Sequence, residues 1–207
     1  LKYKTIKQKV QIADSHIKTS TVKNLNESLR ETRTFSKGKY ESKTTIFISH
    51  KHSDLEDLEE LEGVMEILED LGAKIYIDSM DNSMPGHTCG DTALRIKDVI
   101  KHCNKFILIA TEKAIESYWC NWELGIGDTY KYIEHIAILP IKEKGEYDRN
   151  YKGNEYLQIY PSIDYENGTN RYRNSTELIP RGYYVCKPKN KEGIRYITAL
   201  KDWLNQK

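Results

Sequence analysis

The sequence predicts an α/β fold in which helices cover both faces of a parallel sheet. Between residues 44 and 142, segments rich in β-branched and aromatic residues alternate four times with segments of helical periodicity. The strand segments are apolar throughout, a pattern typical of strands that are buried on both faces. This alternation favours parallel strands that are joined by right-handed helical crossovers.

The first strand is predicted at residues 44–50, which include three consecutive large apolar residues. A helix follows at once, because Ser53 and Glu56 have the spacing of a capping box. Leucines and other apolar residues then recur on one helical face as far as Leu71, and Gly72 is placed to end the helix.

The next elements repeat this order. Residues 73–78 form the second predicted strand, and residues 79–90 form a long turn-rich loop. A second helix begins near Thr88 and places apolar residues on one face as far as Cys103. Residues 105–111 form the third predicted strand, which is the most apolar of the four.

A third helix is predicted at residues 117–133, and a fourth strand at residues 135–142. Residues 144–180 are polar and irregular, and we expect them to be an insertion. Residues 181–187 are a candidate fifth strand. Apolar residues recur on one face of residues 194–204, which predicts a terminal helix.

The chain has 207 residues and carries 32 Lys and Arg against 31 Asp and Glu, so its formal net charge is only +1. Sequence-independent binding to nucleic acid needs an excess of cations, so we expect no nucleic-acid partner. No apolar segment approaches the roughly 20 residues of a membrane span, and the polar start does not resemble a signal peptide. We therefore expect a cytoplasmic protein with no membrane partner. Residues 1–43 are polar and predict an N-terminal extension or arm before a domain at residues 44–207.

Ligands of open parallel sheets bind beyond the carboxyl ends of the strands, so candidate residues are sought there. Trp119 and Glu123 are four residues apart and share one face of the third helix. The indole is suited to stacking on a flat heterocycle, and the carboxylate to binding ribose hydroxyls or a developing cation. The alternative is a tryptophan that packs in the core and a glutamate that is solvated.

Two further strand ends carry candidate residues. Ser49 and His50 leave the first strand just before a helix begins, a position suited to a phosphate or another anion. Asp78 ends the second strand before the long loop. The alternatives are a solvated strand-to-helix turn and an ordinary surface loop. The four cysteines have no spacing typical of a metal site, so no metal is expected.

Four segments together resemble a TIR (Toll/interleukin-1 receptor) domain of the bacterial kind. They are IFISHKHSD, GAKIYID, CNKFILIAT and SYWCNWELG, which occur in this order within residues 44–142. The resemblance implies a flavodoxin-like, five-stranded parallel sheet. For enzymatic members it also implies cleavage of the bond between nicotinamide and ribose in NAD+.

The resemblance assigns roles to five residues. Glu123 matches the catalytic glutamate, and Trp119 matches an aromatic residue at the nicotinamide end of the pocket. Ser49 and His50 are expected near the ribose and phosphates, and Asp78 at the start of the so-called BB loop. NAD+ is then the substrate, and no cofactor is required. We also expect Glu123 to be an exposed pocket carboxylate that contributes little to stability.

Two functions follow from the resemblance. The first is an enzyme that converts NAD+ to nicotinamide and ADP-ribose, or to a cyclic ADP-ribose-type signal for an effector, in bacterial antiphage defence. The second is a non-catalytic adaptor that acts through contacts between TIR domains. In either case we expect self-association through the BB loop, at about residues 79–90.

Overall fold

The computed structural model describes residues 44–51, 59–78, 89–141, 151 and 153–206. The predicted arm at residues 1–43, the capping box at Ser53 and Glu56, and all but the end of the BB loop lie outside these described residues. Within the described ranges, no helix combines the length and the apolar character that a membrane span requires.

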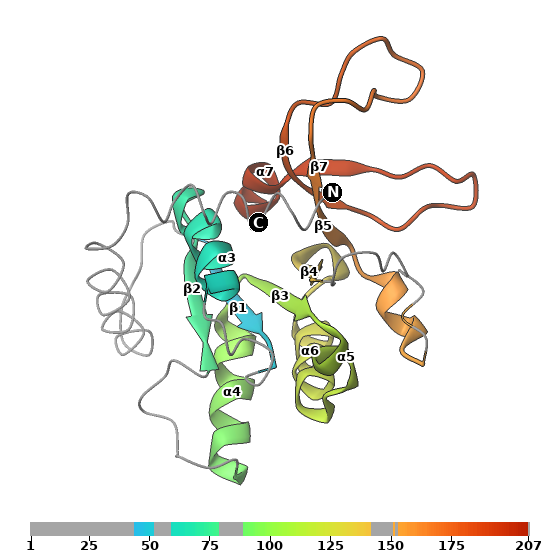
Figure 1. The fold of residues 1–207 in the computed structure, drawn as a ribbon. Helices are drawn as coiled ribbons and strands as arrows, with labels where there is room; N and C mark the ends of the chain where they lie inside the picture. The colour runs from blue at the N-terminus through green and yellow to red at the C-terminus, as the bar shows by residue number, and fades with distance from the viewer. Residues whose placement is uncertain (1–43, 52–58, 79–88, 142–150, 152, 207) are drawn as a thin grey trace.

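Among the described residues, seven strands form one sheet in the order β2-β1-β3-β4-β5-β6-β7 (Figure 1). Their bounds are β1 (Thr45–Ser49), β2 (Lys74–Ile77), β3 (Lys105–Ala110), β4 (Ile136–Pro140), β5 (Ser162–Glu166), β6 (Gly182–Cys186) and β7 (Ile197–Ala199). The pairs from β2 through β5 are parallel, whereas β6 is antiparallel to both β5 and β7. The predicted α/β class is confirmed, with an antiparallel extension at one edge of the sheet.

Helices cover both faces of this sheet. They are α3 (Glu59–Asp70), α4 (Gly90–His102), α5 (Glu112–Glu116), α6 (Tyr118–Tyr130) and α7 (Leu200–Asn205), with short 3-10 helices η3 (Ile133–His135) and η4 (Glu155–Ile159). Apolar residues of α3 and α7 pack on one face, and those of α4, α5, α6 and η4 pack on the other. The four predicted parallel strands are almost entirely buried, as their apolar composition indicates.

The helix α6 lies close against β3. A Cβ atom at Gly127 would be 3.0 Å from Cδ2 of the Phe106 ring, so glycine is what permits this approach. The start of α6 is fixed by Ser117, whose hydroxyl accepts a hydrogen bond from the Cys120 amide at 3.4 Å. Together these contacts hold the helix that carries Trp119 and Glu123 against the sheet.

The carboxyl-terminal third differs from the predictions. The candidate fifth strand at residues 181–187 is observed as β6, but the fifth strand is β5, which lies within the expected insertion. The strand β5 is short and only alternate residues, Ile163 and Tyr165, are buried, so it lacks the apolar run of the other strands. The predicted helix at 194–204 begins only at Leu200, because residues 197–199 pair with β6.

Candidate functional site

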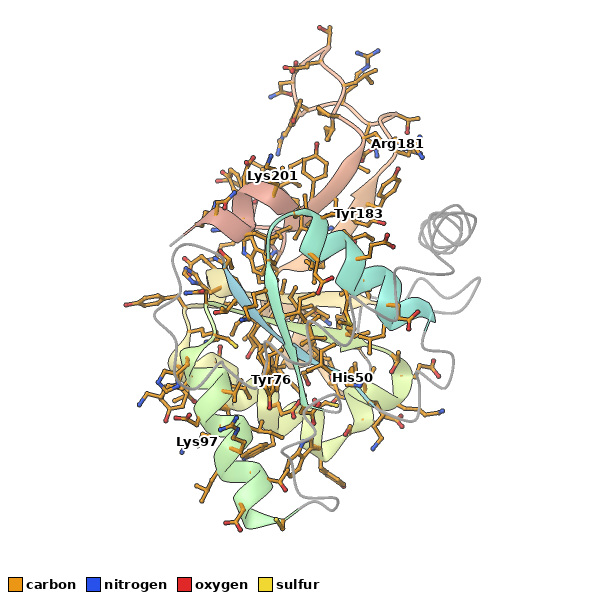
Figure 2. The ribbon with its side chains drawn as sticks, turned by 90° about the vertical axis from the view of Figure 1, so that its left-hand side faces the viewer. His50, Tyr76, Lys97, Arg181, Tyr183 and Lys201 are labelled. Atoms are coloured by element: carbon orange, nitrogen blue, oxygen red, sulfur yellow. The ribbon has the colours of Figure 1, made fainter. Side chains whose placement is uncertain are left out.

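The candidate site lies where β1, β2 and α6 meet at the carboxyl end of the sheet. Ser49 is the last residue of β1, and Asp78 follows β2 directly. Because β1 and β2 are parallel neighbours, their ends lie at the same edge. Figure 2 shows His50 just beyond the end of β1, near the strand that carries Tyr76.

Ser49 and Glu123 form the central contact of the site. The Ser49 hydroxyl donates a hydrogen bond to Oε2 of Glu123 at 2.5 Å. Ser49 is 0% exposed and Glu123 is 1% exposed. A short hydrogen bond between buried groups on a strand and a helix holds the carboxyl group in one orientation.

The second oxygen of the same carboxyl group is unsatisfied. Oε1 of Glu123 is buried and has no hydrogen-bond partner in the described part of the chain. A buried oxygen that makes no hydrogen bond costs about 1–3 kcal/mol, so such atoms are rare in folded proteins. A hydroxyl group of a bound ligand would satisfy this oxygen.

The environment of Glu123 favours its protonated form. Burial raises the pKa of Glu123, and the nearby charge of Asp78 raises it further. The hydrogen bond from Ser49 and, to a smaller extent, the neighbouring Trp119 side chain favour the carboxylate and act in the opposite direction, and the resulting pKa is about 8. At neutral pH this carboxyl group is therefore mainly protonated.

The expectation of an exposed carboxylate at Glu123 is wrong, as is the alternative of a solvated one. Glu123 faces the end of β1, and the sheet and α6 exclude water from it. A helical pattern shows which residues share a face, but it does not show how deeply that face is buried.

Trp119 is half-buried beside the carboxyl group. Its ring lies 5.0 Å from the ring of Trp122, with an angle of 38° between the two planes. Residues three apart on a helix are neighbours, so Trp119 and Trp122 of α6 are placed to contact each other. The Trp122 ring therefore packs against one side of the Trp119 ring.

Cys120 is a member of the site that the sequence did not indicate. Its side chain is buried, and its thiol is close enough to both Ser49 and Glu123 to be affected by them. Burial raises the pKa of the Cys120 thiol, and the charge of Glu123 contributes in the same direction, so this cysteine is an unreactive wall of the site. The signal was its position three residues before Glu123, on the same helical face.

The remaining predicted residues lie around this centre. Asp78 is half-buried and close enough to influence Glu123 electrostatically. His50 is buried rather than solvated, at 6% exposure, and adjoins Ser49 in the chain. The structure thus brings Ser49, Asp78, Trp119 and Glu123 into one site, with His50 at its edge.

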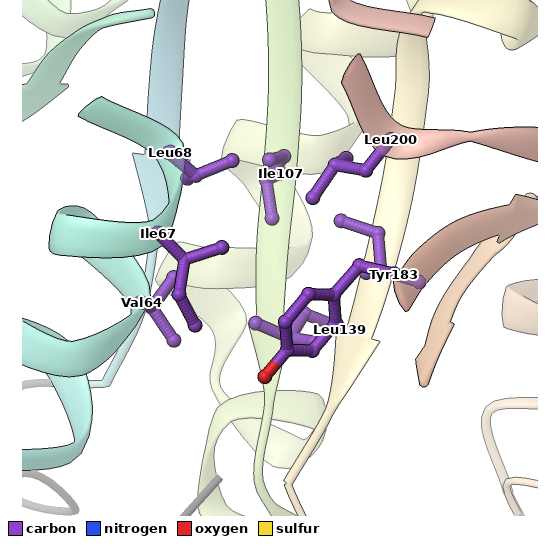
Figure 3. Close-up of a pocket in the computed structure, with 8 residues that line it drawn as sticks. Val64, Ile67, Leu68, Ile107, Leu139, Tyr183 and Leu200 are labelled. Carbon is purple, nitrogen blue, oxygen red and sulfur yellow. The ribbon is translucent and has the colours of Figure 1, made fainter. Parts of the chain in front are cut away.

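A separate pocket lies on the other face of the sheet, between α3 and the β6–α7 region (Figure 3). Its lining consists of aliphatic side chains and one tyrosine, Tyr183. The lining contains no charged group and none of the predicted site residues. Its chemistry is that of incomplete core packing and does not suit a dinucleotide.

Three comparisons relate the chain to known proteins. A family model described as TIR domain matches residues 46–179. The chain is 31% identical over 120 residues to a Bacillus cereus (strain MSX-D12) protein named "Probable 3' cyclic ADP-D-ribose synthase ThsB'", with 57% of this chain and 59% of the relative aligned. The chain thus spans about three-fifths of the relative's length. Among solved structures, it is similar to the TIR domain of the Toll-related receptor TRR-2 from Hydra magnipapillata, at 20% identity and a TM-score of 0.38, covering 52% of this chain and 77% of that chain.

Proposed function

This chain belongs to the TIR domain family, and from the carboxyl group buried at its strand ends we propose that it breaks the nicotinamide–ribose bond of NAD+. The observation that carries the proposal is the Glu123 carboxyl group, in which Ser49 holds one oxygen and the other has no partner in the described residues. The name of the Bacillus relative, a probable cyclic ADP-ribose synthase, supports the same substrate class.

The chemistry suits these side chains. When the bond between nicotinamide and the ribose C1′ breaks, its electron pair goes to the pyridinium nitrogen, and nicotinamide leaves as a neutral molecule. Positive charge then develops on the ribose, as in glycoside hydrolysis. The Glu123 carboxylate stabilises that charge and accepts a hydrogen bond from a ribose hydroxyl at Oε1. This contact is strongest in the transition state and so lowers the barrier.

Substrate binding supplies the ionised form of Glu123. The empty site holds a proton near neutral pH, because burial and Asp78 raise the pKa of Glu123 to about 8. The nicotinamide ring of NAD+ carries a positive charge, and a cation beside a carboxyl group lowers its pKa. Binding of NAD+ is therefore accompanied by release of the proton, which leaves a carboxylate where the ribose cation forms.

Trp119 provides the surface for the nicotinamide ring. Its indole lies next to Glu123 and is braced by Trp122, so its orientation is restricted. Stacking of flat rings contributes to binding in an offset or tilted arrangement. In this proposal, His50 and the end of β1 lie toward the ribose and phosphates.

The fate of the ribose cation decides the product. Capture by water gives ADP-ribose, and capture by a hydroxyl group of the same molecule gives a cyclic isomer. The relative's name favours the cyclic product for this chain as well. Such a product would be a signal to an effector protein, as expected for antiphage defence.

One observation favours the adaptor as a second candidate. A deeply buried, protonated glutamate that is hydrogen-bonded to a serine is also a way to fasten a helix to a sheet. If Glu123 has only this structural role, the chain acts through contacts with another TIR domain. Binding to that domain would then survive substitution of Glu123.

Nicotinamide release from NAD+ tests the proposal directly. The purified chain is assayed by chromatography and mass spectrometry over a range of protein concentrations, beside the Glu123→Gln variant. We expect the substitution to reduce turnover at least 100-fold. The matched control is Glu66→Gln on the exposed face of α3, which should leave turnover unchanged. Full turnover in Glu123→Gln, or no release at any concentration, would contradict the proposal.

A further inference from the structure

The antiparallel extension at the carboxyl end of the chain is rich in positive charge. Residues 167–196 contain seven Lys and Arg but only two Asp and Glu, whereas the whole chain is nearly balanced. Residues 1–43 are also basic, with eleven Lys and Arg against four Asp and Glu, so the acidic excess lies in residues 44–166. The near-zero total charge, from which we expected no nucleic-acid partner, hides this separation.

Two connections between strands carry the seven Lys and Arg of the extension. Residues 167–181 join β5 to β6, and residues 187–196 join β6 to β7. Figure 1 shows both standing out from the layers of helix and sheet. The second connection, which we call the basic hairpin, begins after the TIR domain match has ended at residue 179.

The basic hairpin is held in one shape by its own hydrogen bonds. The amide of Lys187 donates to the Tyr196 carbonyl at 2.9 Å, and the amide of Asn190 donates to the Ile194 carbonyl at 2.9 Å. The Asn190 side-chain oxygen also accepts from the amides of Glu192 and Ile194, at 3.1 and 2.8 Å. Its lysines are therefore carried on a pre-formed support, which reduces the entropy lost on binding.

The lysines of this hairpin are directed outward. Lys187, Lys189 and Lys191 are all exposed, and none of them has an ion pair in the described part of the chain. Arg195 differs, because it is half-buried and pairs with Asp164 of β5 at 3.3 Å. One cation thus anchors the hairpin, and the three lysines remain available to a partner.

The arrangement combines spaced cations with exposed aromatic rings. Lys187, Lys189 and Lys191 follow one another at two-residue intervals along the basic hairpin. Tyr196 is 61% exposed and lies opposite Lys187 across the hairpin. The other connection, which joins the opposite end of β6, carries Arg173 and the exposed Tyr172.

We propose that the basic hairpin binds a single strand of nucleic acid. The lysines neutralise successive phosphates, and Tyr196 offers a ring on which a base stacks. An acidic protein would use the cations but has no need of exposed tyrosines beside them. The basic hairpin joins β6 to β7, whereas Glu123 belongs to α6. Binding of nucleic acid by the hairpin therefore does not depend on NAD+ cleavage.

The test is the binding of a fluorescently labelled 20-nucleotide oligo-dT and oligo-U to the full chain, measured by anisotropy from 50 to 200 mM KCl. The test variant replaces Lys187, Lys189 and Lys191 by glutamine. We expect at least tenfold weaker binding at 100 mM KCl. The slope of log affinity against log salt should become shallower by about two, since each phosphate contact contributes roughly 0.7.

A matched control removes the same charge elsewhere. Lys97, Lys101 and Lys113 are exposed on α4 and α5, and Figure 2 shows Lys97 at the opposite end of the molecule from Arg181. The control variant, with glutamine at these three positions, should bind as the unmodified chain does. A further variant, Tyr196→Ala, should weaken binding at least fivefold without changing the salt slope.

Three results would overturn the proposal. The first is no binding of either oligonucleotide at micromolar protein. The second is equal loss of binding in the hairpin variant and its control. The third is competition by poly-glutamate as effective as that by unlabelled oligo-dT, which would identify an acidic protein as the partner. Circular dichroism and thermal unfolding establish that each variant is folded.

Discussion

Replacing Ser49 by alanine should raise the pKa of Glu123 and displace the pH dependence of activity. The substitution removes the hydroxyl that donates to Oε2 of Glu123 at 2.5 Å and leaves β1 otherwise unchanged. That hydrogen bond favours the ionised carboxylate, so its loss favours the protonated form.

The size of the effect follows from the contact. A hydrogen bond to a charged, buried group contributes about 1.5–3 kcal/mol. A pKa change of one unit corresponds to about 1.4 kcal/mol of difference between the protonated and ionised forms. Ser49→Ala should therefore raise the pKa of Glu123 by about 1–2 from its value of about 8. Activity that requires the carboxylate should then need a correspondingly higher pH.

Two measurements check this prediction. The pH dependence of kcat/KM for nicotinamide release should show its acidic limb at higher pH in Ser49→Ala than in the unmodified chain. Titration of the Glu123 carboxyl carbon by ¹³C NMR reports the same pKa without any need for catalysis. Ser49→Thr retains a hydroxyl group and should stay close to the unmodified profile.

A second substitution should act in the opposite direction. The charge of Asp78 raises the pKa of Glu123, so Asp78→Asn should lower it. The reasoning is refuted if Ser49→Ala and Asp78→Asn move the carboxyl titration in the same direction, or if neither moves it. General damage to the fold would change both profiles alike, whereas opposite displacements require the specific contacts.

Three further predictions concern stability and binding. Since the pKa of Glu123 rises from 4.5 to about 8 on folding, the folded chain retains a proton that the unfolded chain loses, and stability falls as pH rises through this interval. Glu123→Gln should therefore unfold at a higher temperature than the unmodified chain at pH 9 but not at pH 5, as differential scanning calorimetry would show. Lys105 is fully buried, with its Nζ atom 4.9 Å from the centre of the Trp203 ring, and burial lowers its pKa to about 8. Removing this cation from water therefore lowers the stability of the folded chain at neutral pH. Lys105→Met should increase the free energy of unfolding at pH 7 by about 1–3 kcal/mol in urea titrations, and an unchanged or lower value would show that the cation is stabilising. Trp119→Ala should raise KM for NAD+ about tenfold with a smaller effect on kcat in steady-state kinetics, and an unchanged KM would exclude stacking on nicotinamide.

Part of the fold could be predicted because its signals are local. The strands β1, β3 and β4 are apolar runs whose predicted and observed bounds differ by at most two residues at each end. The strands β5 and β7 were missed, since each is short and is defined by pairing with β6. Backbone pairing between distant segments leaves little pattern in a polar sequence.

The candidate site, too, could be predicted only in part from the sequence. The sequence by itself determined that Trp119 and Glu123 share a helical face, that Ser49 and Asp78 end parallel strands, and that these segments together resemble a TIR domain. Only the tertiary structure decided that Ser49 reaches Glu123 across 74 positions and that Glu123 is buried. The physical reason is that a carboxyl group's pKa and its free hydrogen-bonding capacity depend on water exclusion and on charges from other elements. No local pattern contains either quantity.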